Sequence, residues 1–101
     1  LFIEDLDEYL YHVDRMMMNL KRSRMLGKLK GLIVGGMSNM NDNSISFGKT
    51  AEQIILDHTK DYDFPICFGF PAGHLSDNCS LRLGVNSVLE INKNGVSLSQ
   101  E

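Results

Sequence analysis

The sequence predicts a small layered domain of the α/β class, with a short parallel sheet, two helices and C-terminal antiparallel strands. Short apolar, β-branched runs alternate with segments of helical periodicity over residues 1–70, which is typical of βαβ units with parallel strands. Residues 80–99 instead alternate apolar with polar side chains between turn signals, which is typical of antiparallel strands. A length of 101 residues allows one domain, spanning residues 1–101.

The first strand and the first helix are predicted within residues 1–26. Leu1-Phe2-Ile3 is a short β-prone run and predicts a buried strand. Asp5 with Glu8 predicts a capping box at the start of the helix, and Gly27 predicts a left-handed cap at its end. The helix is expected over residues 7–26, because apolar residues recur there at spacings of three and four: Leu6, Tyr9, Leu10, Val13, Met16, Met17 and Leu20. Since Met16 and Met17 fall on this apolar face, we expect core filling rather than an adaptable methionine-rich binding surface.

The remaining elements follow in order along the chain. Residues 31–36 hold a β-branched run between glycines and predict the second strand, and polar residues 38–49 predict a surface loop. Thr50 and Gln53 predict a capping box for a second helix that ends near Lys60, with its inward side formed by Ala51, Ile54, Ile55 and His58. Residues 64–70 predict a third, buried strand that begins near Pro65. Antiparallel strands are expected over residues 80–83, 87–91 and 95–99.

Composition and charge exclude several functional classes. A net charge of −3 lacks the basic footprint of nucleic-acid binding, so no nucleic-acid partner is expected. No window approaches the roughly 18–20 apolar residues of a membrane span, so no membrane partner is expected either. Cys67 and Cys79 are too few for a disulfide framework, and we expect reduced thiols in a cytoplasmic protein. Because Leu1 lies inside an apolar stretch, we expect the chain to be part of a longer protein.

Charges are polarised along the first predicted helix. Five acidic residues lie within residues 4–14, whereas five of the ten basic residues lie within residues 21–30. This order matches the helix macrodipole, which favours acids at the amino end and bases at the carboxyl end. A patch for a polyanionic partner is the alternative interpretation, and the acidic total disfavours it.

His74 is the histidine best placed for chemistry. In open parallel sheets ligands bind beyond the carboxyl ends of the strands, and the loop from Pro71 to His74 follows the third predicted strand. An imidazole titrates near neutral pH and can transfer protons there. Glu4, after the first predicted strand, is the natural partner, because a carboxylate fixes the tautomer of the ring and stabilises its protonated form. The alternatives are a surface loop histidine and a helix-capping acid.

A glutamate and a histidine activate a nucleophile but do not supply one. The sequence contains no Gly-x-Ser-x-Gly elbow. Cys67 is a candidate nucleophile, but its place inside a predicted strand favours a buried structural thiol. His12 and His58 have no partner at metal-ligand spacing, so neither a metal site nor another cofactor is expected.

Two segments resemble one protein family. Residues 1–16, LFIEDLDEYLYHVDRM, and residues 69–78, GFPAGHLSDN, closely resemble the C-terminal domain of LD-carboxypeptidases, serine peptidases that include muropeptide-recycling and microcin-immunity enzymes. The resemblance covers nearly the whole chain and implies a β/β/α domain of the swivelling type. It also implies a Ser-Glu-His catalytic set in which Glu4 and His74 match the family's glutamate and histidine. The serine would lie on an N-terminal domain outside this chain. Arg82 stands where the family commonly has proline, a departure that bears on the local strand geometry and not on the catalytic set.

The resemblance implies the C-terminal half of a catalytic site that releases terminal D-alanine from murein tetrapeptides in peptidoglycan recycling. Its expected partners are the murein peptide, the N-terminal domain of the same protein and, in a homodimer, a second copy. One alternative is a microcin-immunity-type peptidase acting on peptidyl or aminoacyl nucleotides, which would use the same residues. Another is a binding module that keeps the fold without catalysis.

Overall fold

The computed structural model describes residues 1–101 as a mixed α/β domain, as the sequence predicts. A three-stranded parallel sheet has the order β1-β2-β3, and β4 pairs with β5 in a separate antiparallel hairpin. The strands are β1 (Phe2–Leu6), β2 (Leu32–Ser38), β3 (Ile66–Cys67), β4 (Ser87–Asn92) and β5 (Gly95–Gln100), and the helices are α1 (Leu10–Arg22) and α2 (Ala51–Thr59), with a short 3-10 helix at Leu26–Lys28. None of the helices is long and apolar enough to cross a bilayer.

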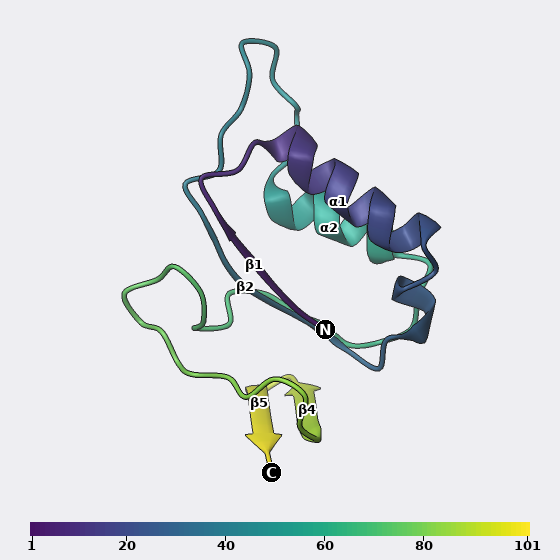
Figure 1. The fold of residues 1–101 in the computed structure, drawn as a ribbon, viewed down its shortest axis with the longest axis vertical. Helices are drawn as coiled ribbons and strands as arrows, with labels where there is room; N and C mark the ends of the chain where they lie inside the picture. Colours follow the sequence, from purple (N-terminus) through teal and green to yellow (C-terminus); the bar gives the residue numbers. More distant parts are fainter.

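Three layers form the molecule. Figure 1 shows α1 and α2 side by side on one side of the parallel sheet, with the β4–β5 hairpin on the other side. The core lies between the helices and the sheet and consists of Val13, Met17, Leu26, Leu32, Val34, Ile54 and Ile55. Only 14 of the 101 residues are buried. The hairpin adds little to this core. Its contact with the sheet is loose and leaves an open cleft of about 850 Å³ beside Phe2 and Ile33.

The first helix differs from the prediction at both ends. Residues 5–7 continue along β2, where the backbone N–H of Asp7 donates to the Ser38 carbonyl at 2.9 Å, and Asp7 then turns the chain with φ +57. Asp5 therefore cannot cap the helix, and the predicted capping box is wrong. The helix ends at Arg22, and Arg24 rather than Gly27 takes the left-handed conformation, with φ +63. Gly27 lies within the 3-10 helix, so the predicted glycine cap is also wrong.

The second helix confirms the prediction. The Gln53 backbone N–H donates to Thr50 Oγ1, and the Thr50 N–H donates to Gln53 Oε1 at 2.8 Å, which completes the capping box. His58 is buried and lies 2.7 Å from Asp14, so this pair joins α2 to α1. Met17 is buried, but Met16 is 44% exposed. The expected core role is therefore confirmed for Met17 and wrong for Met16.

The later strands are fewer and shorter than predicted. Only Ile66 and Cys67 of the predicted strand 64–70 pair with β2 in a regular ladder. Residues 80–83 form no strand, which corrects that prediction, whereas the two following strands and their tight turn are confirmed. Arg82 is bound to β5 through its guanidinium, which donates to the Gln100 carbonyl at 2.7 Å, and through its own carbonyl, which accepts from Gln100 Nε2 at 2.8 Å. Arg82 thus anchors the segment to the hairpin without a strand.

Candidate active site

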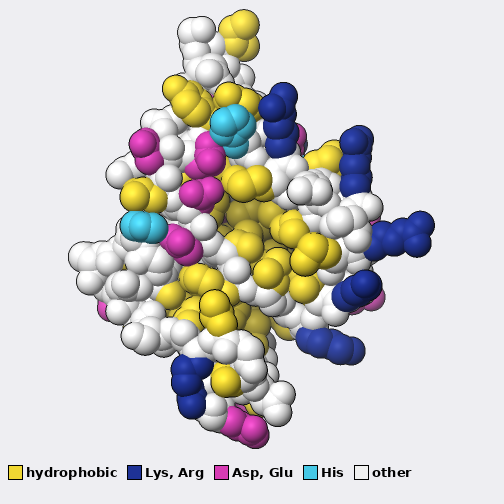
Figure 2. Space-filling view, viewed as in Figure 1, with side chains coloured by type: hydrophobic (Ala, Val, Ile, Leu, Met, Phe, Trp, Pro, Cys, Tyr) yellow, Lys and Arg dark blue, Asp and Glu magenta, His cyan; other side chains and the backbone are white.

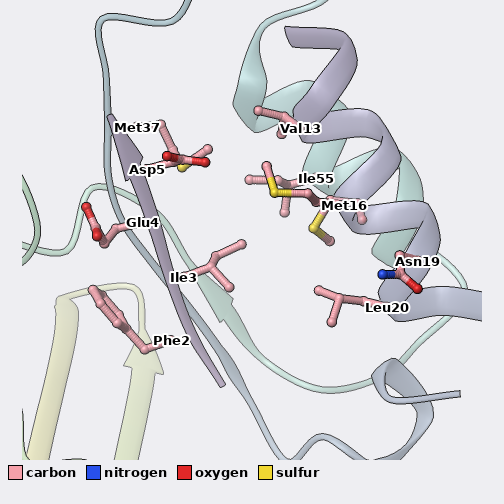
Figure 3. Close-up of a pocket in the computed structure, with 11 residues that line it drawn as sticks. Phe2, Ile3, Glu4, Asp5, Val13, Met16, Asn19, Leu20, Met37 and Ile55 are labelled. Carbon is pink, nitrogen blue, oxygen red and sulfur yellow. The ribbon is translucent and has the colours of Figure 1, made fainter. Parts of the chain in front are cut away.

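Glu4 lies inside β1, not after the end of a strand as the sequence predicts. The pairing between β1 and β2 shifts register between Ile3 and Asp5, so Glu4 sits at an irregularity in the ladder. Successive strand residues point to opposite faces of a sheet, and Figure 3 shows Ile3 pointing toward α1 while Phe2 and Glu4 point away from it. Glu4 therefore faces the side of the sheet opposite the helices.

The loop that carries His74 packs directly on two glycines of β2. The Gly36 N–H donates to the Ala72 carbonyl at 2.9 Å. A Cβ on Gly35 would lie 2.3 Å from that same carbonyl oxygen, and one on Gly36 would lie 2.8 Å from Leu75. The glycine pair is thus covered by the chain itself. Its function is to admit the loop.

Gly73 brings the loop against Glu4. Its φ is +112, and a Cβ there would lie 2.7 Å from Glu4 Oε2 and 3.0 Å from Glu4 Cβ. Glycine is required at this position both for the backbone conformation and for the close approach. The next residue, His74, is thereby delivered to the carboxylate.

Glu4 and His74 are in contact, although they are 70 positions apart. Nδ1 of His74 lies 3.0 Å from Oε2 of Glu4, which confirms the predicted contact. The Glu4 side chain is 26% exposed and that of His74 is 57% exposed. With the glutamate ionised, Nδ1–H donates to it, and Nε2, which has no hydrogen bond within the chain, carries the lone pair. A histidine held in this way can accept a proton at Nε2 while the carboxylate stabilises the imidazolium.

Two further side chains hold the backbone on either side of the His74 ring, and sequence reasoning missed both. Ser38, the last residue of β2, donates from Oγ to the His74 carbonyl at 2.9 Å. Asn78 accepts from the Gly73 N–H through Oδ1 at 3.0 Å. Asn78 lies within the segment 69–78 that carries the family resemblance, but no local pattern gave it or Ser38 a role, since a serine at a strand end and an asparagine in a loop are common. Together they limit the movement of the loop that presents His74.

No side chain of this chain is hydrogen-bonded to Nε2 of His74, where a nucleophile would lie. Cys67 is buried in β3, and burial raises the pKa of its thiol, which disfavours the reactive thiolate. Ser38 directs its hydroxyl to the His74 carbonyl rather than to the ring. His58 is bound to Asp14 between the helices, as a structural pair.

His12 forms a second glutamate–histidine pair, with Nδ1 2.6 Å from Glu8. The hydrogen bond from His12, followed by that from the Tyr9 backbone N–H, holds the pKa of Glu8 below its ordinary value. This pair joins residues only four apart, with Glu8 just before α1 and His12 in its first turn, so the contact is local. The Glu4–His74 pair differs because only the tertiary fold creates it.

Replacing Gly73 with alanine tests the packing of this loop. We expect Gly73→Ala to lower the free energy of unfolding by more than about 1 kcal/mol, because it combines backbone strain with a clash against Glu4. Gly48→Ala is the matched control, since Gly48 also has positive φ, at +85, but no neighbour within 4 Å of a Cβ. Urea unfolding of both variants measures the difference. Equal losses would contradict the close approach between Gly73 and Glu4.

Comparison with known proteins decides the family. Residues 1–89 match the family model of the LD-carboxypeptidase C-terminal domain. The chain belongs to this family. Both Glu4 and His74 lie within the matched residues, whereas β5 lies beyond them.

Two relatives of this LD-carboxypeptidase domain show what share of a longer protein it corresponds to. It is 30% identical over 89 residues to a probable murein peptide carboxypeptidase of Bacillus subtilis, covering 88% of this chain and 28% of that protein. It also resembles the crystal structure of muramoyltetrapeptide carboxypeptidase from Oxalobacter formigenes, with a TM-score of 0.86 and 28% identity over 99% of this chain. This chain covers 35% of that structure. The domain thus spans about a third of the length of these relatives.

Proposed function

We propose that this domain supplies the glutamate and histidine of a serine LD-carboxypeptidase that releases terminal D-alanine from murein tetrapeptides. The observation that carries the proposal is the 3.0 Å contact between His74 Nδ1 and Glu4 Oε2, with Nε2 left for proton transfer. Membership of the LD-carboxypeptidase family and the names of the two relatives support the reaction class. The proposed location is the cytoplasm, where murein peptides are recycled.

In this mechanism His74 acts as general base and then as general acid. Nε2 takes the proton from a serine on an N-terminal domain of the same polypeptide, and the serine oxygen attacks the carbonyl of the scissile bond. Glu4 holds the ring in the required tautomer and stabilises the imidazolium. Nε2–H then donates to the departing amine of D-alanine, and water hydrolyses the acyl-enzyme through the same base. The steps use neither a metal nor an organic cofactor.

A substrate comparison tests the proposal with the full-length protein that contains this domain. We expect D-alanine release from a tetrapeptide whose scissile bond follows an L-centre, at least about 100-fold faster than from a peptide ending in D-Ala–D-Ala. Aminoacyl nucleotides form the third arm, because a microcin-immunity-type peptidase would use the same residues. Hydrolysis of the nucleotide substrates alone would replace the murein assignment by that alternative. No hydrolysis in any arm would favour a non-catalytic binding module.

A further inference from the structure

An open apolar groove of about 500 Å³ lies between β1 and α1. Figure 3 shows Ile3 and Leu20 facing each other across it, and Figure 2 shows the hollow, lined by apolar side chains, near the centre of this face. Its floor is the core itself, since the buried residues Val13, Met17 and Ile55 line it. The groove is therefore a place where the helical layer stops short of covering the sheet.

The edge of the groove is unprotected. Met16, on its rim, is 44% exposed. β1 is an edge strand with β2 as its single neighbour, so its outer backbone groups pair with no other strand. Exposed apolar hollows beside an unpaired edge are typical of surfaces that another segment covers.

The topology indicates what kind of segment fits. Strands and helices alternate in the order β1, α1, β2, α2, β3, and both helices lie on one face of the sheet. A helix that preceded β1 would continue this alternation and lie on the same face, beside α1 and over the outer side of β1. The groove is lined by residues of β1 and α1 and therefore lies at that position.

The relatives are much longer than this domain, so they have enough additional residues to form such a helix. This domain covers 28% of the Bacillus subtilis protein and 35% of the Oxalobacter formigenes structure. The backbone at Leu1 donates to the Gly31 carbonyl at 3.0 Å, which fixes the amino end of β1 at one end of the groove. A polypeptide preceding Leu1 would emerge there, and the short connection would give it a high effective concentration over the groove.

The charges around the groove also suit a helix antiparallel to β1. Asp5 lines the groove toward the carboxyl end of β1, where the positive amino end of such a helix would lie. Lys21 and Arg22 are the last two residues of α1, at the opposite end of the groove, where the negative carboxyl end of the added helix would lie. Figure 2 shows basic side chains along that side of the hollow and acidic ones on the other.

We propose that the residues immediately preceding Leu1 in the longer polypeptide form an amphipathic helix that fills this groove. The proposal shares with the proposed function only the premise that the domain has an N-terminal extension. Its test does not involve catalysis, so that either can fail alone.

Methionine oxidation provides the test. The 101-residue chain, the chain with about 30 of its natural preceding residues and the full-length protein are each exposed to hydrogen peroxide, and sulfoxide formation is followed by mass spectrometry. Met16 reports on the groove, and Met25 is the internal control, because it is 48% exposed and does not line the groove. We expect Met16 to react about 5-fold or more slowly in both longer forms, with Met25 unchanged.

Three results would overturn the proposal. The first is equal oxidation of Met16 in all forms. The second is protection in the full-length protein but not in the short extension, which would assign the groove to a distant domain. The third is protection in the 101-residue chain that grows with protein concentration, which would assign it to a second copy. If the full-length protein releases no D-alanine while its Met16 is protected, the proposed function alone is refuted.

Discussion

Replacing His74 with alanine in the full-length protein is expected to lower turnover of an L,D-tetrapeptide by at least about 10³-fold. The substitution removes the only proton acceptor that the Glu4 carboxylate orients at this site. The fold should persist, because the His74 side chain is 57% exposed and forms no hydrogen bond other than that to Glu4. Steady-state D-alanine release measures the effect, and circular dichroism checks the fold.

Two companion variants show whether the loss belongs to this pair. Glu4→Gln is expected to lower turnover to a smaller degree, because the amide still contacts the ring but no longer stabilises the imidazolium. His12→Ala is the matched control, since it removes a histidine from the other exposed glutamate–histidine pair. Turnover near the normal rate in His74→Ala, or an equal loss in His12→Ala, would refute the assignment of His74.

The sequence predicted the alternation of strands and helices because apolar periodicity and turn residues are local signals. Thr50 and Gln53 formed their capping box as expected, since a cap depends on residues three apart. The box expected at Asp5 failed for a tertiary reason: backbone pairing with β2 extends β1 through Leu6 and leaves no helical turn there. The spacing of residues along the chain does not reveal whether their backbone will pair with a neighbouring strand.

The candidate pair was predictable in identity but not in geometry. The sequence predicts Glu4 and His74 each just after the end of a strand, and it predicts their contact because the two strands share one parallel sheet. The structure instead puts Glu4 inside β1 and brings His74 to it through Gly73, with Ser38 and Asn78 holding the backbone. Such supporting contacts depend on angles between segments far apart in sequence, which one sequence does not encode in any local pattern.

The 101-residue chain alone is expected to fold and yet to release no D-alanine above background. Its core, its capping box and the Glu4–His74 contact are complete within these residues. Stability should be modest, because only 14 residues are buried and the groove beside Met16 is open. Cooperative urea unfolding would establish the fold before any assay.

We expect catalytic silence because no side chain of this chain is hydrogen-bonded to Nε2 of His74 as a nucleophile would be. The hydroxyl of Ser38 is bound to the His74 carbonyl rather than to the ring, and burial raises the pKa of the Cys67 thiol, which disfavours its thiolate. The measurement compares D-alanine release by the isolated chain, its His74→Ala variant and its Cys67→Ala variant. Turnover that His74→Ala abolishes would mean that a nucleophile lies within these residues. Loss of that turnover in Cys67→Ala as well would identify the thiol, and the serine of the proposed mechanism would then be wrong.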